Sequence, residues 1–321
     1  YCTITDNVSL GSGAGISGEY STPTIRFCVI SNNHADMGGT AISVSGRSSS
    51  DPNGPVISFC QIQGNTSITG ASALYMSGCS PKIDHCLITD NSTEYEGPAL
   101  QFKLCDNALL THCTIANNIQ AGSRGWLYVT CSKVSIENCI AYNNSLADVP
   151  EIGLGGYDCF HRPTLEPEDI DEIKTVLNVQ YSDIQGGIDA VSMQGDPNLI
   201  EYYWGEGNID SDPLFAESDN GDYHLKSQAG RWDANGVTWI QDDVTSPCID
   251  TGDSNSPIMH EVFPNGGVVN MGAYGGTAEA SKSYFGEPVC ETIVAGDING
   301  DCRVDSKDLA ILTSHWLEGS L

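Results

Sequence analysis

Basic side chains are scarce in this sequence of 321 residues, which has 13 Lys and Arg against 42 Asp and Glu and a formal net charge of −29. A chain of this charge is repelled by nucleic acid and by anionic lipid surfaces. Long apolar runs are also missing, since no stretch approaches the roughly 20 apolar residues that span a bilayer. The composition therefore argues against nucleic-acid binding and membrane-spanning roles, and it favours cations, above all calcium, and neutral or basic partners.

Catalytic signatures are missing as well. The sequence contains no nucleophile elbow, phosphate-binding loop, HExxH motif or CxxC pair. Charged residues make up only 17%, whereas glycine alone numbers 35 and Ser, Thr and Asn are abundant. This composition is typical of a β-rich extracellular protein, so we expect an extracellular or cell-surface location.

A short motif recurs along the first part of the chain: an aliphatic residue, two variable residues, Cys, one residue, an aliphatic residue, two residues and Asn. The intervals between successive motif cysteines are 26, 32, 26, 27 and 26 residues. These cysteines are Cys2, Cys28, Cys60, Cys86, Cys113 and Cys139. Each period holds short alternating runs broken by Gly, Pro, Asn and Ser, without a helical apolar stripe. Such a period predicts the coils of a parallel β-solenoid.

Stacked coils place equivalent residues directly above one another at about 4.8 Å. The motif asparagines are therefore expected to form a ladder, and sequons such as Asn65-Thr66-Ser67 are interpreted as ladder positions rather than glycosylation sites. We interpret the motif cysteines, and a second column at Cys79, Cys105 and Cys131, as small residues that fill the interior. Thirteen cysteines is an odd number, so at least one thiol is unpaired or bridges two chains.

The repeat resembles that of right-handed parallel β-helix proteins, a fold best known from pectate lyases and related polysaccharide-active enzymes. Segments within 207–276 resemble the C-terminal cap of large secreted bacterial β-helix proteins. The resemblance implies an all-β, right-handed parallel β-helix of about seven coils over residues 1–187, followed by an irregular cap over 188–285. Irregular spacing indicates an insert at about 146–176, in which acidic residues after Pro167 favour a short helix.

A second resemblance lies in the tail, where residues 297–308 are similar to the calcium loop of a dockerin repeat. Alternating oxygen ligands from a tight loop converge on one Ca2+ ion, and an acidic residue at the twelfth position closes the shell. The expected ligands are Asp297, Asn299, Asp301, the Arg303 carbonyl, Asp305 and Asp308. An exit helix is expected to follow, with Leu309, Leu312 and Trp316 on one face.

The tail, residues 290–321, departs from the dockerin pattern in two ways. The sixth loop residue is Cys302 instead of Gly, and only one repeat is present. We therefore expect calcium binding, while a cohesin-like partner stays open. Cys290 and Cys302 flank or lie within the loop and are the best disulfide candidates, whereas Cys159 and Cys248 have no assignment.

An enzyme of the β-helix class would carry its site on outward positions of stacked strands. The resemblance implies an Arg or Lys base beside calcium-binding carboxylates for a lyase, and a pair of carboxylates for a hydrolase. The catalytic candidates are Lys103, His161 and Arg162. One expected outward column carries hydroxyls, an amide and two rings that could stack on sugars, and its carbohydrate-binding candidates are Tyr75, Gln101 and Tyr128.

We therefore expect an extracellular β-solenoid with a structural or adhesive role and a calcium-binding tail, and we consider catalysis the weaker hypothesis. The alternatives are a polysaccharide lyase or glycoside hydrolase, or a carbohydrate-binding protein without turnover. Tyr1 lies inside a repeat, so a natural terminus there would expose strand edges able to pair head to tail with another copy. A truncated chain would begin in the same way.

Overall fold

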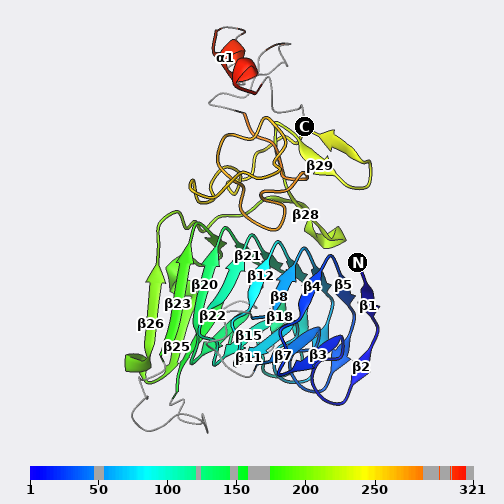
Figure 1. The fold of residues 1–321 in the computed structure, drawn as a ribbon, viewed down its shortest axis with the longest axis vertical. Helices are drawn as coiled ribbons and strands as arrows, with labels where there is room; N and C mark the ends of the chain where they lie inside the picture. The colour runs from blue at the N-terminus through cyan, green and yellow to red at the C-terminus, as the bar shows by residue number, and fades with distance from the viewer. Residues whose placement is uncertain are drawn as a thin grey trace. The chain divides into compact units, whose positions relative to one another are not determined.

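A computed structural model describes residues 1–46, 54–120, 124–144, 151–157, 174–284, 296, 304 and 306–315. The chain divides into two compact units, Tyr1–Ser211 and Asp212–Leu321. The first unit consists almost entirely of short parallel strands, and the second of loops, two hairpins and one helix (Figure 1).

Four parallel sheets build the first unit. Sheet A contains β1 (Thr3–Thr5), β5 (Val29–Ser31), β9 (Gln61–Gln63), β13 (Leu87–Thr89), β17 (Thr114–Ala116), β21 (Ile140–Tyr142) and β24 (Asp183–Ile184). Sheet B contains β2 (Val8–Ser9), β6 (His34–Ala35), β10 (Thr66–Ser67), β14 (Ser92–Thr93) and β18 (Ile119–Gln120). Sheet C contains β3 (Ile16–Glu19), β7 (Ile42–Ser45), β11 (Leu74–Ser77), β15 (Leu100–Lys103), β19 (Leu127–Thr130), β22 (Ile152–Gly156) and β25 (Val191–Gly195). Sheet D contains β4 (Thr24–Arg26), β8 (Val56–Ser58), β12 (Lys82–Asp84), β16 (Ala108–Thr111), β20 (Lys133–Glu137), β23 (Thr175–Gln180) and β26 (Ile200–Trp204).

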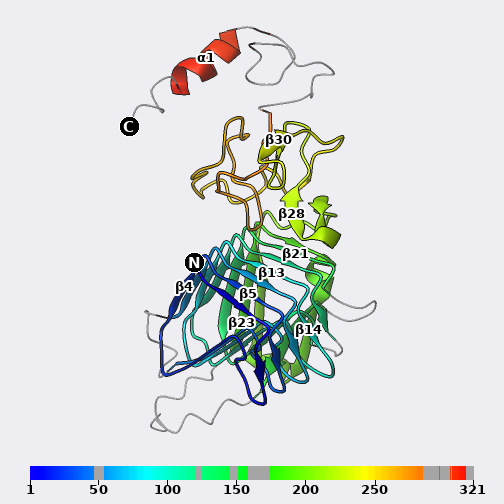
Figure 2. The same ribbon diagram turned by 90° about the vertical axis from the view of Figure 1, so that its right-hand side faces the viewer.

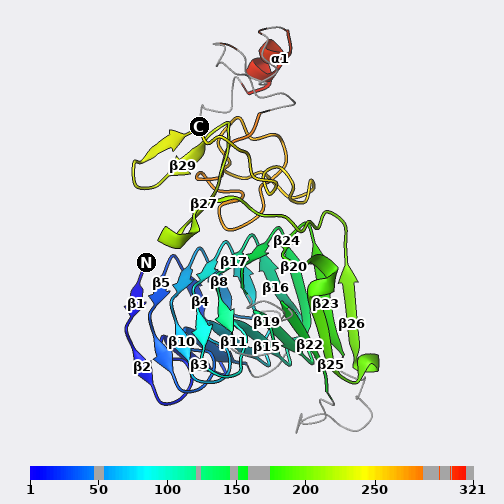
Figure 3. The ribbon, with the colours of Figure 1, turned by 180° about the vertical axis from the view of Figure 1, so that it is seen from behind.

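The chain contributes one strand to each sheet in turn and then begins the next coil. Consecutive coils pair in register, so Ile30 of sheet A lies between Ile4 and Ile62. Figure 2 shows the first unit turned by 90°, and Figure 3 shows the stacked strands from behind. Sheets A, C and D each hold seven strands, which confirms the predicted parallel solenoid of about seven coils.

Aliphatic side chains fill the interior in columns. Leu74, Leu100 and Leu127 pair directly and are fully buried, as the alternating pattern predicts. Sheets A and D bury Ile and Leu in the same way, because strand residues alternate between the interior and the outside with a period of two. The short strands of sheet B instead bury Ala35, Ser67, Thr93 and Gln120.

The predicted asparagine ladder is confirmed in the described coils. Each side-chain Nδ2 donates to the Oδ1 atom of the next asparagine at 2.8–2.9 Å, through Asn7, Asn33, Asn65, Asn91, Asn118 and Asn144. The same Oδ1 atoms accept the preceding asparagine's backbone N–H at 3.0–3.1 Å. From Asn33 to Asn144 these residues are fully buried. The side-chain amides therefore provide hydrogen-bond partners for backbone N–H groups of the turn that water does not reach.

Five of the six motif cysteines occupy interior positions as predicted, whereas Cys2, in the first coil, is exposed. Cys28, Cys60, Cys86, Cys113 and Cys139 are buried and form no disulfide. Each of these thiols donates to the carbonyl two residues earlier at 3.2–3.3 Å. Burial raises the pKa of Cys113, so this thiol stays neutral.

The second cysteine column is only partly as predicted. Cys79 and Cys105 are buried thiols without a disulfide, but Cys131 is disulfide-bonded. The interpretation of Cys131 as a simple packing residue is therefore wrong. Cys159, Cys290 and Cys302 lie outside the described residues, and Cys248 is buried in the second unit.

The solenoid extends beyond the predicted boundary at residue 187. Strands β25 and β26 continue sheets C and D, and Asp183 forms a parallel bridge with Ile209. The boundary was misplaced because the last coil lacks the motif cysteine, and Asn208 Oδ1 accepts the backbone N–H of Ser182 instead.

The predicted insert at about 146–176 also needs correction, because Ile152–Gly156 is strand β22 and Thr175 begins β23. The strand in sheet C was missed because its sequence, IGLGG, carries glycine at both outward positions and shows little β pattern. The helix expected after Pro167 lies outside the described residues.

The second unit has little regular structure. Strands β27 (Phe215–Glu217) and β28 (Asp222–Leu225) form one antiparallel hairpin, and β29 (Arg231–Asp233) and β30 (Thr238–Ile240) form another. Helix α1 (Ser306–His315) confirms the helix predicted after the calcium-type loop. Three short 3₁₀ helices are also present: Gly187–Ala190 and Pro197–Leu199 in the first unit and Ser218–Asn220 in the second. Among the described residues, no helix has the length and apolar character needed to cross a membrane.

Candidate functional site

The outer face of sheet C carries the predicted columns of polar and aromatic side chains. Backbone pairing places Ser17, Ser43, Tyr75, Gln101 and Tyr128 in one line across five coils. Tyr75 and Gln101 are partly exposed neighbours on adjacent strands. The sequence therefore located this column correctly.

Tyr128 differs from its expected role, because only 3% of it is exposed. A Cβ atom at Gly153 would lie 2.8 Å from its ring, and one at Gly155 would lie 2.8 Å from its hydroxyl. The ring therefore lies over glycines of β22, and the Arg124 guanidinium carbon is 4.8 Å from its centroid. Burial and the hydroxyl of Tyr157 raise the pKa of Tyr128. Tyr75 and Gln101 are the accessible members of the predicted carbohydrate set.

Lys103 lies in the neighbouring outward column and is exposed. Its paired residues are Ser77 and Thr130, and the carboxylate of this column, Glu19, is three coils away. Three coil steps of about 4.8 Å place Glu19 about 14 Å from Lys103. Glu19 is the only acid in the described strands of sheet C, so these strands hold no pair of carboxylates of the kind that a glycosidase uses.

The other predicted catalytic candidates, His161 and Arg162, lie outside the described residues. The same is true of the predicted calcium ligands Asp297, Asn299, Asp301, Arg303 and Asp305.

Asp308 is the predicted calcium ligand that the structure describes. It lies in the first turn of α1 and is only 2% exposed, although the neighbouring Leu309 is 59% exposed. Its burial fits an acidic twelfth ligand that closes a calcium loop.

A column of stacked rings follows the turn between sheets D and A, and the sequence reasoning missed it. It contains Tyr1, Phe27, Phe59, His85 and His112, with successive ring centroids 4.7–5.1 Å apart. From Phe27 to His112 each backbone has a positive φ of 46–54°. The left-handed conformation costs a non-glycine residue about 1–2 kcal/mol, which ring stacking partly offsets. The available signal was an aromatic residue or His directly before five successive motif cysteines.

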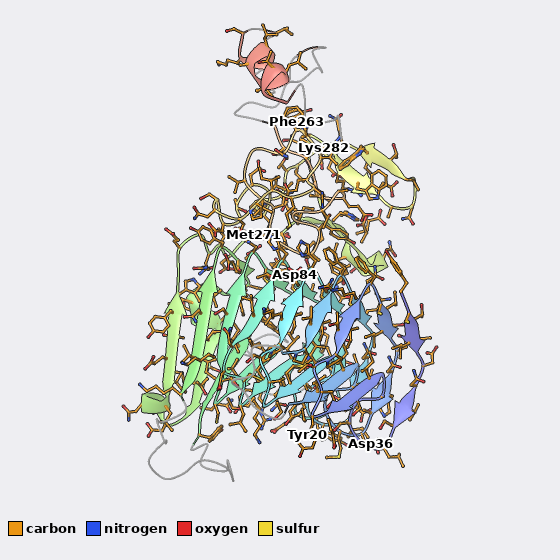
Figure 4. The ribbon with its side chains drawn as sticks, viewed as in Figure 1. Tyr20, Asp36, Asp84, Phe263, Met271 and Lys282 are labelled. Carbon is orange, nitrogen blue, oxygen red and sulfur yellow. The ribbon has the colours of Figure 1, made fainter. Side chains whose placement is uncertain are left out.

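The histidine end of this column also contains a carboxylate. Asp84, at the end of β12 in Figure 4, has its Oδ2 atom 2.8 Å from Nδ1 of His85. Its Oδ1 atom accepts a hydrogen bond from the Thr111 hydroxyl at 2.7 Å. Burial and the adjacent His85 lower the pKa of His112 to about 4. His112 is therefore neutral at pH 7.

Two buried carboxyl groups lie in the second unit. Burial raises the pKa of Glu261 to about 7 and that of Asp250 to about 6. The Oε1 atom of Glu261 accepts the backbone N–H groups of Asn270 and Gly276, both at 2.8 Å. Its Oε2 atom is buried without a hydrogen-bond partner. This arrangement favours a protonated Glu261 at mildly acid pH.

Comparison with known protein families agrees with the architecture. The family described as right handed beta helix region matches residues 1–191, and the family described as disaggregatase related matches residues 192–252. Because the first match covers more than half of the 321 residues, the chain belongs to the right-handed β-helix family. No curated protein and no solved structure matches the chain significantly.

The buried carboxyls predict a pH dependence of the second unit. The folded-state pKa of Glu261, about 7, exceeds its unfolded value, so the folded state binds more protons between about pH 4.5 and 7. Its stabilising contribution is complete below this window and is lost as the pH rises through it. In the wild type, the free energy of unfolding of this unit should fall by on the order of 3 kcal/mol between pH 4.5 and 8 because of Glu261. We expect Glu261→Gln to remove this fall.

Denaturant unfolding followed by the fluorescence of Trp232 and Trp239, which lie in this unit, measures the effect. Asp219→Asn, at an exposed position of the same unit, is the control and should retain the wild-type profile. An identical pH profile in wild type and Glu261→Gln would contradict the proposed protonation.

Proposed function

We propose that this β-solenoid is a non-catalytic structural and adhesive protein that works outside the cell and binds a neutral polysaccharide through the outer face of sheet C. The observation that carries the proposal is the outward pair of Tyr75 and Gln101, which are partly exposed and which the pairing of strands β11 and β15 places side by side. The interior columns hold this outer face on a fixed lattice.

The chemistry of the column suits a sugar polymer. Hydroxyl and amide groups repeat along the solenoid at the strand spacing of about 4.8 Å. The ring of Tyr75 supplies an apolar surface with a polar edge, a combination that serves recognition well. The net charge of −29 disfavours an anionic polymer, so the matching ligand is neutral.

The surroundings of Lys103 support binding over catalysis. A lyase base of the kind implied by the β-helix resemblance lies beside carboxylates that hold calcium. In the described strands of sheet C, the residues paired with Lys103 carry hydroxyls only. A lone amine among hydroxyls has no group beside it to neutralise the charge that develops on an acidic substrate.

Two observations support an extracellular location. The composition is rich in Gly and poor in charge, and Cys131 is disulfide-bonded. Structural disulfides persist in oxidising compartments such as the extracellular space. Head-to-tail self-association and a cohesin-like partner stay predictions from the sequence alone.

A calcium-loaded tail is the second part of the proposal. Asp308 would close the coordination shell, with the remaining oxygens coming from Asp297, Asn299, Asp301, the Arg303 carbonyl and Asp305. The burial of Asp308 in the first turn of α1 supports this assignment.

Glycan binding should depend on the exposed part of the sheet C column. We expect Tyr75→Ala to weaken binding to a neutral polysaccharide about tenfold, because the ring provides the stacking surface, and Gln101→Ala to weaken it less. Affinity electrophoresis in gels that contain neutral or anionic polysaccharides measures the change. Gln61→Ala, an exposed position on sheet A, is the control and should bind as the wild type does.

The same polysaccharides, incubated with the protein, should yield neither new reducing ends nor unsaturated products. Product formation that Lys103→Ala abolishes would establish the lyase alternative and contradict the proposal. Wild-type affinity in Tyr75→Ala would remove sheet C as the binding face.

Calcium should stabilise the tail by mass action, by about 2.7 kcal/mol at a hundredfold excess over Kd. We expect Asp308→Ala to abolish this effect while the solenoid still unfolds as in the wild type. Thermal melting with calcium and with chelator measures it, and Asp189→Ala, at an exposed acid of the first unit, is the control. If chelator shifted the melting of Asp308→Ala as much as that of the wild type, the ligand assignment would be wrong.

A further inference from the structure

The last two rings in the column of stacked rings are imidazoles, whereas the first three are not. Tyr1, Phe27 and Phe59 are simple aromatic rings, whereas His85 and His112 each bring two ring nitrogens into the same stack. Apolar rings already satisfy the packing of this turn in the preceding coils. The ring nitrogens of the two imidazoles are therefore not needed for stacking, and they are able to bind a ligand.

The two imidazoles and one carboxylate converge. The rings of His85 and His112 are parallel to within 10°, with centroids 4.7 Å apart. Asp84 precedes His85 and points its carboxylate at that ring. One donor atom from each of Asp84, His85 and His112 lies within 4.8 Å of the other two. No other group of three or more His, Cys, Asp or Glu side chains in the described residues meets this condition.

A second observation points to a ligand at this place. His112 is only 6% exposed, and its Nε2 atom is buried without a hydrogen-bond partner. A buried polar atom without a partner costs about 1–3 kcal/mol. Coordination to a metal ion satisfies such a nitrogen, and the neutral imidazole is the form that coordinates.

We propose that Asp84, His85 and His112 form a binding site for a zinc-type divalent transition-metal ion on the side of the solenoid. Two imidazole nitrogens and one carboxylate oxygen suit zinc and its neighbours in the first transition row, whereas calcium prefers ligands that are all oxygen. The site is thus chemically distinct from the loop of the tail. Three protein ligands leave a fourth tetrahedral position for water.

Metal binding requires only side-chain movement. Zinc–ligand distances of about 2.0–2.2 Å place the donor atoms of a tetrahedral site about 3.3 Å apart. Since the three donor atoms lie within 4.8 Å of one another, the widest separation must close by at most about 1.5 Å, within the reach of χ rotations. The half-exposed carboxylate of Asp84 would exchange its contact with His85 for the metal ion. The left-handed turn and the strand register are unchanged by this movement.

Zinc titration of the metal-free full-length protein tests the proposal, with excess calcium present to saturate the tail. Isothermal calorimetry should show one zinc site of micromolar or tighter affinity. His112→Phe should weaken it at least tenfold, and because Phe59 already stacks in this column, the variant keeps the ring stack. Circular dichroism and thermal melting establish that each variant is folded.

Two further variants make the result specific. His85→Phe should weaken zinc binding like His112→Phe, which provides an independent test if one variant does not fold. His34→Phe is the matched control, because His34 has an acid, Asp36, 3.8 Å away but lies outside the proposed site, and it should leave the affinity unchanged. Cobalt in place of zinc should give visible bands typical of nitrogen and oxygen ligands.

Three results would overturn the proposal. They are the absence of zinc binding by the folded wild type, an unchanged affinity in both His85→Phe and His112→Phe, and a sulfur-to-cobalt charge-transfer band. The last result would assign the ion to cysteine thiolates instead.

Discussion

The buried asparagine ladder is the interaction on which the solenoid depends. Each ladder amide bonds the amide of the next coil and the backbone of the coil before it, as Asn91 does with Asn118 Oδ1 and the Ile62 carbonyl. Parallel coils must turn several times per period, and every turn leaves backbone groups that need partners. A primary amide has both a donor and an acceptor, so each side chain donates to the next coil and accepts from the previous one. One residue type therefore closes the same turn in six successive coils, from Asn7 to Asn144.

Because the ladder and the interior columns fix the coil register, the outer side chains are free to differ from coil to coil. Tyr75 and Gln101 are neighbours on the outer face of sheet C, while the column of stacked rings changes from Phe59 to His85 and His112. A polymer-binding face and a compact metal site can thus occupy different sides of one scaffold. The left-handed backbone of this column is common to Phe27, Phe59, His85 and His112, so it belongs to the repeated turn and the surrounding coils hold it in place.

The sequence predicted those features that repeat, since the Asn and Cys spacing specified the coil period, the interior columns and the outward register of Tyr75 and Gln101. It failed where a coil departs from the motif: Ile152–Gly156 is a strand without a recognisable pattern, and Asn208 replaces the cysteine of the last coil. The burial of Tyr128 was not predictable, because it depends on two glycines in a strand that was assigned to an insert. The convergence of Asp84 with His112 follows from the pairing of β12 with β16, which the motif period implies, but the residue before each motif cysteine was not considered as a column of its own.

Equilibrium unfolding of Asn91→Ala tests the role of the ladder most directly. Alanine leaves the backbone and side-chain amides of Asn65 without their acceptor and the Ile62 carbonyl without its donor. We expect a loss of about 3 kcal/mol in the free energy of unfolding. Gln63→Ala, at an exposed position of sheet A, should cost at most about 0.5 kcal/mol. A loss in Asn91→Ala no larger than that in Gln63→Ala would show that the aliphatic columns hold the coils without the ladder.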